Sequence, residues 1–375
     1  MENERTRKKI IKDELLALKE KYGDERRTEI IKDYKEFSLE DIIAEEDVVV
    51  TISHGGFIKR FPVSGYRRQG RGGKGVTGAG TKEDDFIEHM FVASTHQYIL
   101  FFTDKGRCYW LKVHEVPEGG RTAKGRSIVN LLDKDKDDNI TAFVAVKEFR
   151  EDQFLIMATE KGTIKKTVLS AYGNVRKGGI NAINLVPGDK LIEVKMTDGK
   201  NDIVIGTRNG FAIRFNEKDV RDMGRTATGV RGVRLGKGDQ VVGLLVIRND
   251  QTTVLVVTEK GYGKRSDIND YRITKRGGKG VITVKTTDKV GKMIAMMEVV
   301  DRDELVIIST QGMVIRQSVK DLRVMGRNTQ GVRVIRLNEG DSIADIARVV
   351  PEDEDGINGN GNGNGNGKND QPLLS

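Results

Sequence analysis

The stretch VVVTISHGGFIKRF, residues 48–61, has five counterparts further along this chain of 375 residues. They are ILFFTDKGRCYWLK (99–112), FLIMATEKGTIKKT (154–167), IVIGTRNGFAIRF (203–215), VLVVTEKGYGKRS (254–266) and LVIISTQGMVIRQ (305–317). Each copy has an apolar run, a turn that ends in glycine, and a second segment with basic residues. Runs rich in Val, Ile and Leu are typical of strands covered on both faces, and glycine supplies the positive φ of a hairpin turn. The copies therefore predict six β-hairpins.

Two glycines recur in every copy. The first closes the hairpin turn: Gly56, Gly106, Gly162, Gly210, Gly261 and Gly312. The second lies 19 residues further on in five copies and 17 in the third: Gly75, Gly125, Gly179, Gly229, Gly280 and Gly331. Units of about 50 residues with several short strands each are typical of propellers and solenoids, and closing a ring leaves few exposed sheet edges. We predict an all-β, six-bladed propeller-like domain over residues 47–350.

The two ends of the chain differ from this domain. Residues 1–33 are predicted to be helical, because apolar side chains recur there at helical spacing before Gly23, the predicted C-cap: Ile11, Leu15, Leu18 and Tyr22. A single apolar stripe on a short helix needs a partner, so we expect the chain to be a fragment. Residues 34–46 are predicted to form a linker. The acidic and then Gly/Asn-rich residues 351–375 are predicted to be a disordered tail.

Positive charge is concentrated in the repeated domain. The formal net charge is +8, whereas residues 1–46 carry −3 and residues 351–375 carry −4, which leaves +15 for residues 47–350. A polyanion is the natural partner of such a domain, although a merely solvated basic surface would give the same count. Cys108 is the one cysteine, no apolar run is long enough for a membrane span, and the N-terminus is not a signal peptide. We therefore expect an intracellular protein with no disulfide framework, metal site or membrane association.

One loop is both basic and rich in glycine. Between Asp47 and Glu83 there are seven Lys or Arg residues and no acid, and four of the seven lie in YRRQGRGGKG, residues 66–75. Glycines let a backbone approach a phosphate chain, and Arg and Lys supply charge-assisted contacts that position DNA without reading its sequence. GRGGKG also satisfies the dinucleotide-binding pattern, but VTGAGT follows it and does not begin a helix, which argues against a nucleotide site.

QGRGGKG, at Gln69–Gly75, resembles the box that marks the C-terminal domain of DNA gyrase A. KEKYGDERRTEI (19–30) is similar to the end of the coiled coil of that family, and LEDIIAEEDVVVTISHGGFIKR (39–60) to the entry into its first blade. The resemblance implies a β-pinwheel, a propeller-like ring whose blades exchange strands, with duplex DNA bound around its outer rim. The family often has a basic residue where this chain has Gly70, a position for which Arg68 would compensate.

The resemblance also implies a role for the ring. DNA wrapped with positive handedness lets gyrase introduce negative supercoils. The implied partners are double-stranded DNA, the rest of gyrase A, and gyrase B in an A2B2 complex at the cytoplasmic nucleoid. No cofactor is expected on this chain, since ATP and magnesium would bind elsewhere in the complex. Neither the cleavage tyrosine nor an ATPase motif is recognised, so no catalytic residue is predicted. The box residues implied to bind DNA, with their basic neighbours, are Arg67, Arg68, Gln69, Gly70, Arg71, Gly72, Gly73, Lys74 and Gly75.

The hairpins predict further DNA contacts. Four residues beyond the turn glycine the chain is basic in five of six copies, and a lysine precedes this position in three of them. We predict that these residues form a ring of exposed charge on the rim: Lys59, Arg60, Lys165, Lys166, Arg214, Lys264, Arg265 and Arg316. KRGGKG at 275–280 echoes the box and is a further candidate.

Two alternatives to the gyrase interpretation remain open from the sequence. The C-terminal domain of the A subunit of topoisomerase IV is similar but usually has a degraded box. A propeller that serves as a protein-interaction scaffold would need no belt of positive charge. The acidic tail would either compete with DNA for the basic rim or be inert.

Overall fold

The computed structural model describes residues 4–24, 28, 43–53, 55–62, 87–120, 123–135, 137–174, 176, 178–249, 251–311 and 314–349. Residue contacts divide the chain into two compact parts, Met1–Ala44 and Glu45–Ser375. Each part is described by itself. The box, most of the predicted linker and the predicted tail lie outside the described residues.

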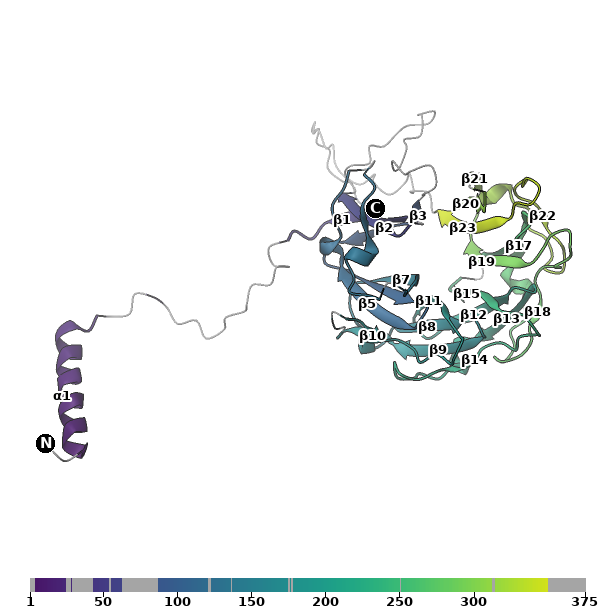
Figure 1. The fold of residues 1–375 in the computed structure, drawn as a ribbon. Coiled ribbons are helices and arrows are strands. Elements are labelled where there is room, and N and C mark those ends of the chain that lie inside the picture. The colour runs from purple at the N-terminus through teal and green to yellow at the C-terminus, as the bar shows by residue number, and fades with distance from the viewer. Residues whose placement is uncertain are drawn as a thin grey trace, which may run out of the picture. The chain divides into compact units, whose positions relative to one another are not determined.

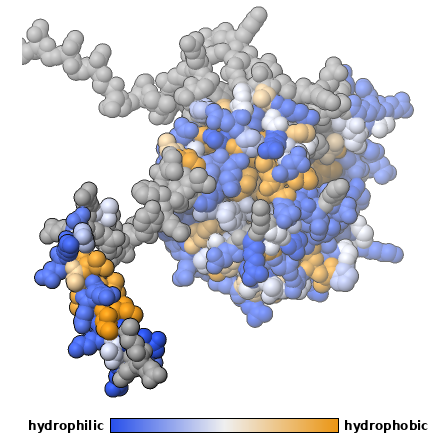
Figure 2. Space-filling view, turned by 60° about the vertical axis from the view of Figure 1, so that its left-hand side comes forward, coloured by the Kyte–Doolittle hydropathy of each residue, from blue (hydrophilic) through white to orange (hydrophobic). Residues whose placement is uncertain are grey.

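The first part contains the helix α1 (Glu4–Tyr22). The Gly23 amide donates to the Lys19 carbonyl oxygen at 2.8 Å, which closes the last turn. The large apolar side chains of the helix are all exposed: Ile10, Ile11, Leu15, Leu16, Leu18 and Tyr22. Figure 2 shows hydrophobic residues gathered along the helix. The predicted helix is confirmed for residues 4–22, whereas residues 23, 24 and 28 are not helical; residues 1–3, 25–27 and 29–33 lie outside the described part.

The second part contains six antiparallel hairpins. Each hairpin begins one repeat, and the repeats are called units 1 to 6 in chain order. The hairpins are β1 (Asp47–Ser53) with β2 (Phe57–Pro62), β4 (Tyr98–Thr103) with β5 (Arg107–Lys112), β8 (Phe154–Thr159) with β9 (Thr163–Val168), β12 (Asp202–Thr207) with β13 (Phe211–Asn216), β16 (Thr253–Thr258) with β17 (Tyr262–Asp267), and β20 (Glu304–Ser309) with β21 (Val314–Ser318). The five described turn glycines all have positive φ, between 73° and 85°. The predicted hairpins are confirmed.

A third strand of each unit pairs with the first strand of its own hairpin. These strands are β3 (Ile87–Ser94), β7 (Ile140–Val146), β11 (Leu191–Thr197), β15 (Val241–Ile247), β19 (Met293–Val299) and β23 (Ile343–Val349). Figure 1 shows them on the inside of a ring of six blades, and β23 lies against β3, so that the last blade meets the first. The predicted six-bladed propeller is confirmed.

The outermost strand of a blade comes from the next unit. The two-residue strands β6 (Arg126–Ser127), β10 (Ile180–Asn181), β14 (Val230–Arg231), β18 (Val281–Ile282) and β22 (Val332–Arg333) each pair with the second hairpin strand of the preceding unit. The strand exchange implied by the family resemblance is therefore present. The sixth sheet has three strands among the described residues, and the corresponding residues 76–77 of unit 1 lie outside them.

The hydrophobic core lies between adjacent blades. One cluster packs Val48 and Val50 of β1 against Phe101 of β4, and four further clusters fill the other described blade contacts in the same way. The hairpins of units 2 to 5 each lie between two clusters, so both of their faces are covered, as the apolar runs predicted. A short 3-10 turn follows each of the last five hairpins: η2 (Val113–Glu115), η4 (Leu169–Tyr172), η5 (Glu217–Asp219), η6 (Ile268–Asp270) and η7 (Val319–Asp321).

Candidate nucleic-acid interface

A ten-residue segment of one unit forms the outer edge of the preceding blade in four places. Its first residue makes an isolated parallel bridge to the second hairpin strand of that blade, and its last two residues are the exchanged strand. We call these stretches rim segments: residues 118–127, 222–231, 273–282 and 324–333. By glycine spacing, residues 68–77 of unit 1, which contain the box, are the corresponding segment.

The second glycine of the repeat is needed where the rim segment touches the preceding blade. Gly280 has φ +81°, and a Cβ there would lie 2.3 Å from the Ala212 carbonyl oxygen. Gly229 approaches the Ile164 carbonyl oxygen in the same way, at 2.6 Å. A side chain at either position would force the rim segment off the blade, which explains the constant spacing of this glycine.

Arginine side chains fasten two of the rim segments to their neighbours. Arg276 donates from Nε to the Asp219 carbonyl oxygen at 2.8 Å and from Nη1 to that of Arg231 at 3.0 Å. Arg327 repeats this arrangement one unit later, on the carbonyl oxygens of Asp270 and Ile282. The loops are therefore held in one shape at the surface, which lowers the entropy cost of binding an extended ligand.

The predicted ring of exposed charge is wrong for most of its members, because neighbouring blades cover these strands. Lys166, Arg214 and Arg265 are only 4–6% exposed. Arg214 and Arg265 donate to carbonyl oxygens of the next unit, those of Ile268 at 2.9 Å and Leu322 at 2.8 Å. These cations hold blades together and do not face solvent.

Two members of the predicted ring are more accessible. Arg60 keeps 15% of its side chain exposed and donates from Nε to the Val116 carbonyl oxygen at 2.8 Å. The Arg316 side chain is 62% exposed and pairs with Glu304. In unit 2 the same position is occupied by Trp110, and no isolated bridge is present there in the described part.

The lysines that precede this position are also buried, so their predicted exposure is wrong too. Lys59 donates from Nζ to the carbonyl oxygens of Gly120 and Ala123, at 3.2 and 2.8 Å. Lys264 reaches the carbonyl oxygens of Gly326 and Arg327, and Lys165 reaches that of Arg225. Each ammonium therefore supports a rim segment of the next unit from beneath, and the lysines act on the shape of the rim.

Burial makes the charge of two of these lysines costly. Desolvation lowers the pKa of Lys165 and of Lys264 from 10.5 to about 8. Between pH 8 and 10.5 the unfolded chain therefore binds more protons than the folded one, so the free energy of unfolding rises with pH in this window. Burial raises the pKa of the Cys108 thiol above its ordinary value of 9.0. At higher pH this thiol therefore makes the free energy of unfolding fall as the pH rises.

We expect the free energy of unfolding to increase by about 1–2 kcal/mol between pH 8 and 9, as both lysines lose their proton in the folded state. Urea unfolding of the chain at a series of pH values measures this. The double variant Lys165→Met/Lys264→Met should lose the increase. An identical pH profile in both proteins would show that the two ammonium groups do not titrate in this range.

The exposed cations of the rim were mostly missed from the sequence. They lie in or next to the rim segments: Lys124, Arg126, Arg231, Arg272, Lys275, Lys279, Arg323 and Arg333. Lys124 lies over the Phe57 ring at 3.8 Å, and Lys279 over the Phe211 ring at 4.6 Å, so that aromatic faces of the preceding blade support both ammonium groups. Aligning the repeats on their second glycine, with the box as template, would have found these residues.

The box itself, Arg67–Gly75, lies outside the described residues. Its predicted contacts therefore stay predictions. The candidate 275–280 is described, and it lies in the rim segment 273–282 with Lys275 and Lys279 exposed.

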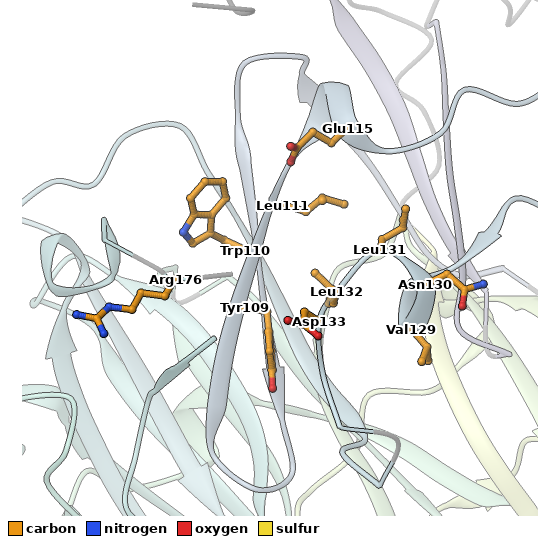
Figure 3. A pocket seen from close by; sticks show the side chains of 10 residues that line it. All are labelled: Tyr109, Trp110, Leu111, Glu115, Val129, Asn130, Leu131, Leu132, Asp133 and Arg176. Atoms are coloured by element: carbon orange, nitrogen blue, oxygen red, sulfur yellow. The ribbon is translucent and has the colours of Figure 1, made fainter. Parts of the chain in front are cut away.

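A cavity of about 650 Å³ opens beside β5 (Figure 3). Leu111, Leu131 and Leu132 line it together with the carboxylates of Glu115 and Asp133, while Trp110 points to the other side of the strand. Two acids and one cation, Arg176, line the cavity, so it lacks the excess of positive charge that a polyanion needs. Within the described ranges no group of three or more His, Cys, Asp or Glu residues is placed to hold a metal ion, and no helix is long and apolar enough to cross a membrane.

The fold and its outer edge define a class: a six-bladed propeller with exchanged strands and a basic rim. The family model described as DNA gyrase C-terminal domain, beta-propeller matches residues 47–94, 97–146, 153–198, 201–248, 252–299 and 303–349. The A subunit of DNA gyrase from Staphylococcus aureus is 44% identical over 352 residues, which are 93% of this chain and 40% of that protein. The chain belongs to the family of DNA gyrase A C-terminal domains.

Solved structures agree with this assignment. The structure of a DNA gyrase A C-terminal domain has a TM-score of 0.64 and 26% identity, and covers 81% of this chain and 99% of that one. The crystal structure of the C-terminal domain of DNA topoisomerase IV has a TM-score of 0.73 and 27% identity, over 83% and 95%. The solved structures thus have this ring in the C-terminal domains of both enzymes. The sequence match is what assigns the chain to the gyrase A family. The chain spans 40% of the length of the curated relative that it matches.

Proposed function

We propose that the outer edge of the ring binds and bends duplex DNA, and that this chain carries no catalytic site of its own. The observation that supports the proposal most is the repetition of the rim segment. Glycine-rich, basic loops recur at equivalent outer positions, and each of the four described ones pairs at both ends with the blade before it. Phosphates follow one another along a duplex, so a ligand with repeated negative charge fits repeated cations on a convex edge.

Bending a duplex requires many such contacts. Smooth bending of a 20–30 base-pair site by 40–90° costs on the order of 1–6 kcal/mol. Cations on several blades can supply this, whereas one basic loop cannot. The box and its basic neighbours, Arg67–Gly75, are proposed to bind DNA on the rim of unit 1, with Arg60 and Arg316 as accessible neighbours.

The wrap is proposed to have positive handedness, so that strand passage by the rest of the enzyme introduces negative supercoils. The partners are then double-stranded DNA, the remainder of gyrase A, and gyrase B in an A2B2 complex, in the cytoplasm at the nucleoid. ATP and magnesium would act on the rest of that complex. A protein-interaction scaffold is the second candidate, and it does not account for the repeated exposed cations of the rim.

Affinity for duplex DNA is expected to fall steeply with salt, since each neutralised phosphate releases counterions. Contacts from the five rim segments predict a slope of roughly −4 or steeper in a plot of log K against log salt concentration. Fluorescence anisotropy of a labelled duplex, measured at a series of potassium chloride concentrations, gives this slope. A slope near zero would contradict a phosphate-binding rim and favour the scaffold.

A further inference from the structure

The rim is not uniform around the ring. The first residue of the rim segment, which bridges to the preceding blade, is acidic in two units and apolar in two others. It is Glu118 in unit 2 and Asp222 in unit 4, but Ile273 in unit 5 and Val324 in unit 6. All four side chains are at equivalent places on the outer edge, so this position sets the local character of the rim.

The acidic residues remain largely in solvent. Glu118 lies 3.7 Å from Arg60 with 61% of its side chain exposed, and Asp222 lies 3.2 Å from Lys166 with 57% exposed. Each therefore faces a cation of the preceding blade and still presents negative charge outward. A phosphate chain passing these two places meets a carboxylate among the cations.

Beneath the apolar residues Ile273 and Val324, the cations of the preceding blade have other partners. In units 4 and 5 the corresponding cations turn to acids outside the rim segments, Arg214 to Asp202 and Arg265 to Asp301. No acid is needed on the rim there, and Ile273 and Val324 are 59% and 49% exposed. Their backbone is fixed, because the next amide donates to the Arg214 carbonyl oxygen at 2.8 Å in one case and to that of Arg265 at 2.9 Å in the other.

Residues 272–282 and 323–333 contain no Asp or Glu at all. Their exposed cations are Arg272, Lys275, Lys279, Arg323 and Arg333. Two consecutive units thus present a rigid edge on which uncharged side chains stand between basic ones. Apolar side chains of this kind pack against sugars and base edges where a duplex is bent, whereas a carboxylate would be repelled by the phosphates.

We propose that, of the four described rim segments, those of units 5 and 6 form the arc on which DNA approaches the ring most closely, with Ile273 and Val324 in direct contact with the duplex. The rim segments of units 2 and 4 hold DNA less closely because of Glu118 and Asp222. This inference rests on the proposed function and specifies which of the described rim segments grip DNA most strongly.

The test places acids on the arc. The 375-residue chain with Ile273→Glu/Val324→Glu is compared with Val92→Glu/Val186→Glu, which makes the same change in net charge at residues that are 57% and 43% exposed and lie outside the rim segments. Duplex affinity at roughly 100 mM salt should fall at least about tenfold for the first variant and less than about twofold for the second. Equal losses would overturn the proposal, and thermal melting of both variants verifies that they are folded.

The reciprocal variant examines the acidic positions. Glu118→Gln/Asp222→Asn removes two exposed charges and keeps the shape of the side chains, and it should tighten binding roughly two- to fivefold. Unchanged affinity would overturn the role given to these acids. If the unmodified chain fails to bind duplex DNA, the proposed function itself fails; if it binds and the arc variant binds equally well, only this inference does.

Discussion

Gyrase assembled from A subunits in which Arg67, Arg68, Arg71 and Lys74 are replaced by alanine is expected to relax DNA but to introduce no negative supercoils. The four side chains are the cations of the box and of the two residues before it, and by glycine spacing this loop corresponds to the described rim segments of the later units. Without them the segment of unit 1 loses all of its cations, and the bent path is no longer stabilised. The measurement is the topology of a plasmid after incubation with ATP.

A matched control removes the same charge elsewhere. Alanine at Lys147, Lys190, Lys200 and Lys218 replaces four exposed lysines outside the rim segments, and this variant should supercoil normally. Full supercoiling by the box variant would take the box out of the mechanism. Loss of both activities together would indicate a defect in assembly, which the control and a melting curve would reveal.

The second large effect concerns stability. Arg214→Met should lower the free energy of unfolding by about 3 kcal/mol. The reason is that Asp202, whose side chain is nearly buried, loses the cation that pairs with it. The guanidinium lies within 2.9 Å of the Asp202 carboxylate and also donates to the Ile268 carbonyl oxygen of the next unit. The Arg214 side chain is only 7% exposed, so duplex affinity of the folded variant should change less than about twofold.

Arg316→Met is the matched comparison for Arg214→Met. Its side chain lies at the equivalent place of the last hairpin but is 62% exposed, and its loss should cost less than about 1 kcal/mol. Urea unfolding and anisotropy titration of both variants separate the two roles. If Arg214→Met melts normally and binds DNA poorly, then the buried arginine is a DNA contact after all.

The sequence was sufficient to predict the ring. Each hairpin requires a glycine at its turn, and each rim segment requires a second glycine where it meets the preceding carbonyl, as at Gly280 and Ala212. Both requirements are local and recur in every unit, so the spacing records the architecture. The exchange of strands between units came from the family resemblance, because a two-residue strand such as β18 leaves no periodic pattern.

The position of the charges could not be predicted in the same way. Basic residues at the end of a hairpin strand suggested a wet surface, but in a propeller both faces of the strand are covered. Long side chains such as Lys264 then reach carbonyl oxygens of the next unit. One signal was available in the repeats. The position just before the basic residue is lysine in units 1, 3 and 5 but Ile213 in unit 4, and Gly278 of the unit 5 rim segment lies over Ile213. An isoleucine at the equivalent position indicates that this position is covered.

DNA is expected to follow the outer edge of this ring in a positive wrap. Nicked circular DNA, ligated in the presence of increasing amounts of the chain and then deproteinised, measures it most directly. A positive wrap raises the linking number above that of the protein-free control, in proportion to the protein bound. An unchanged linking number, or a lower one, would contradict it.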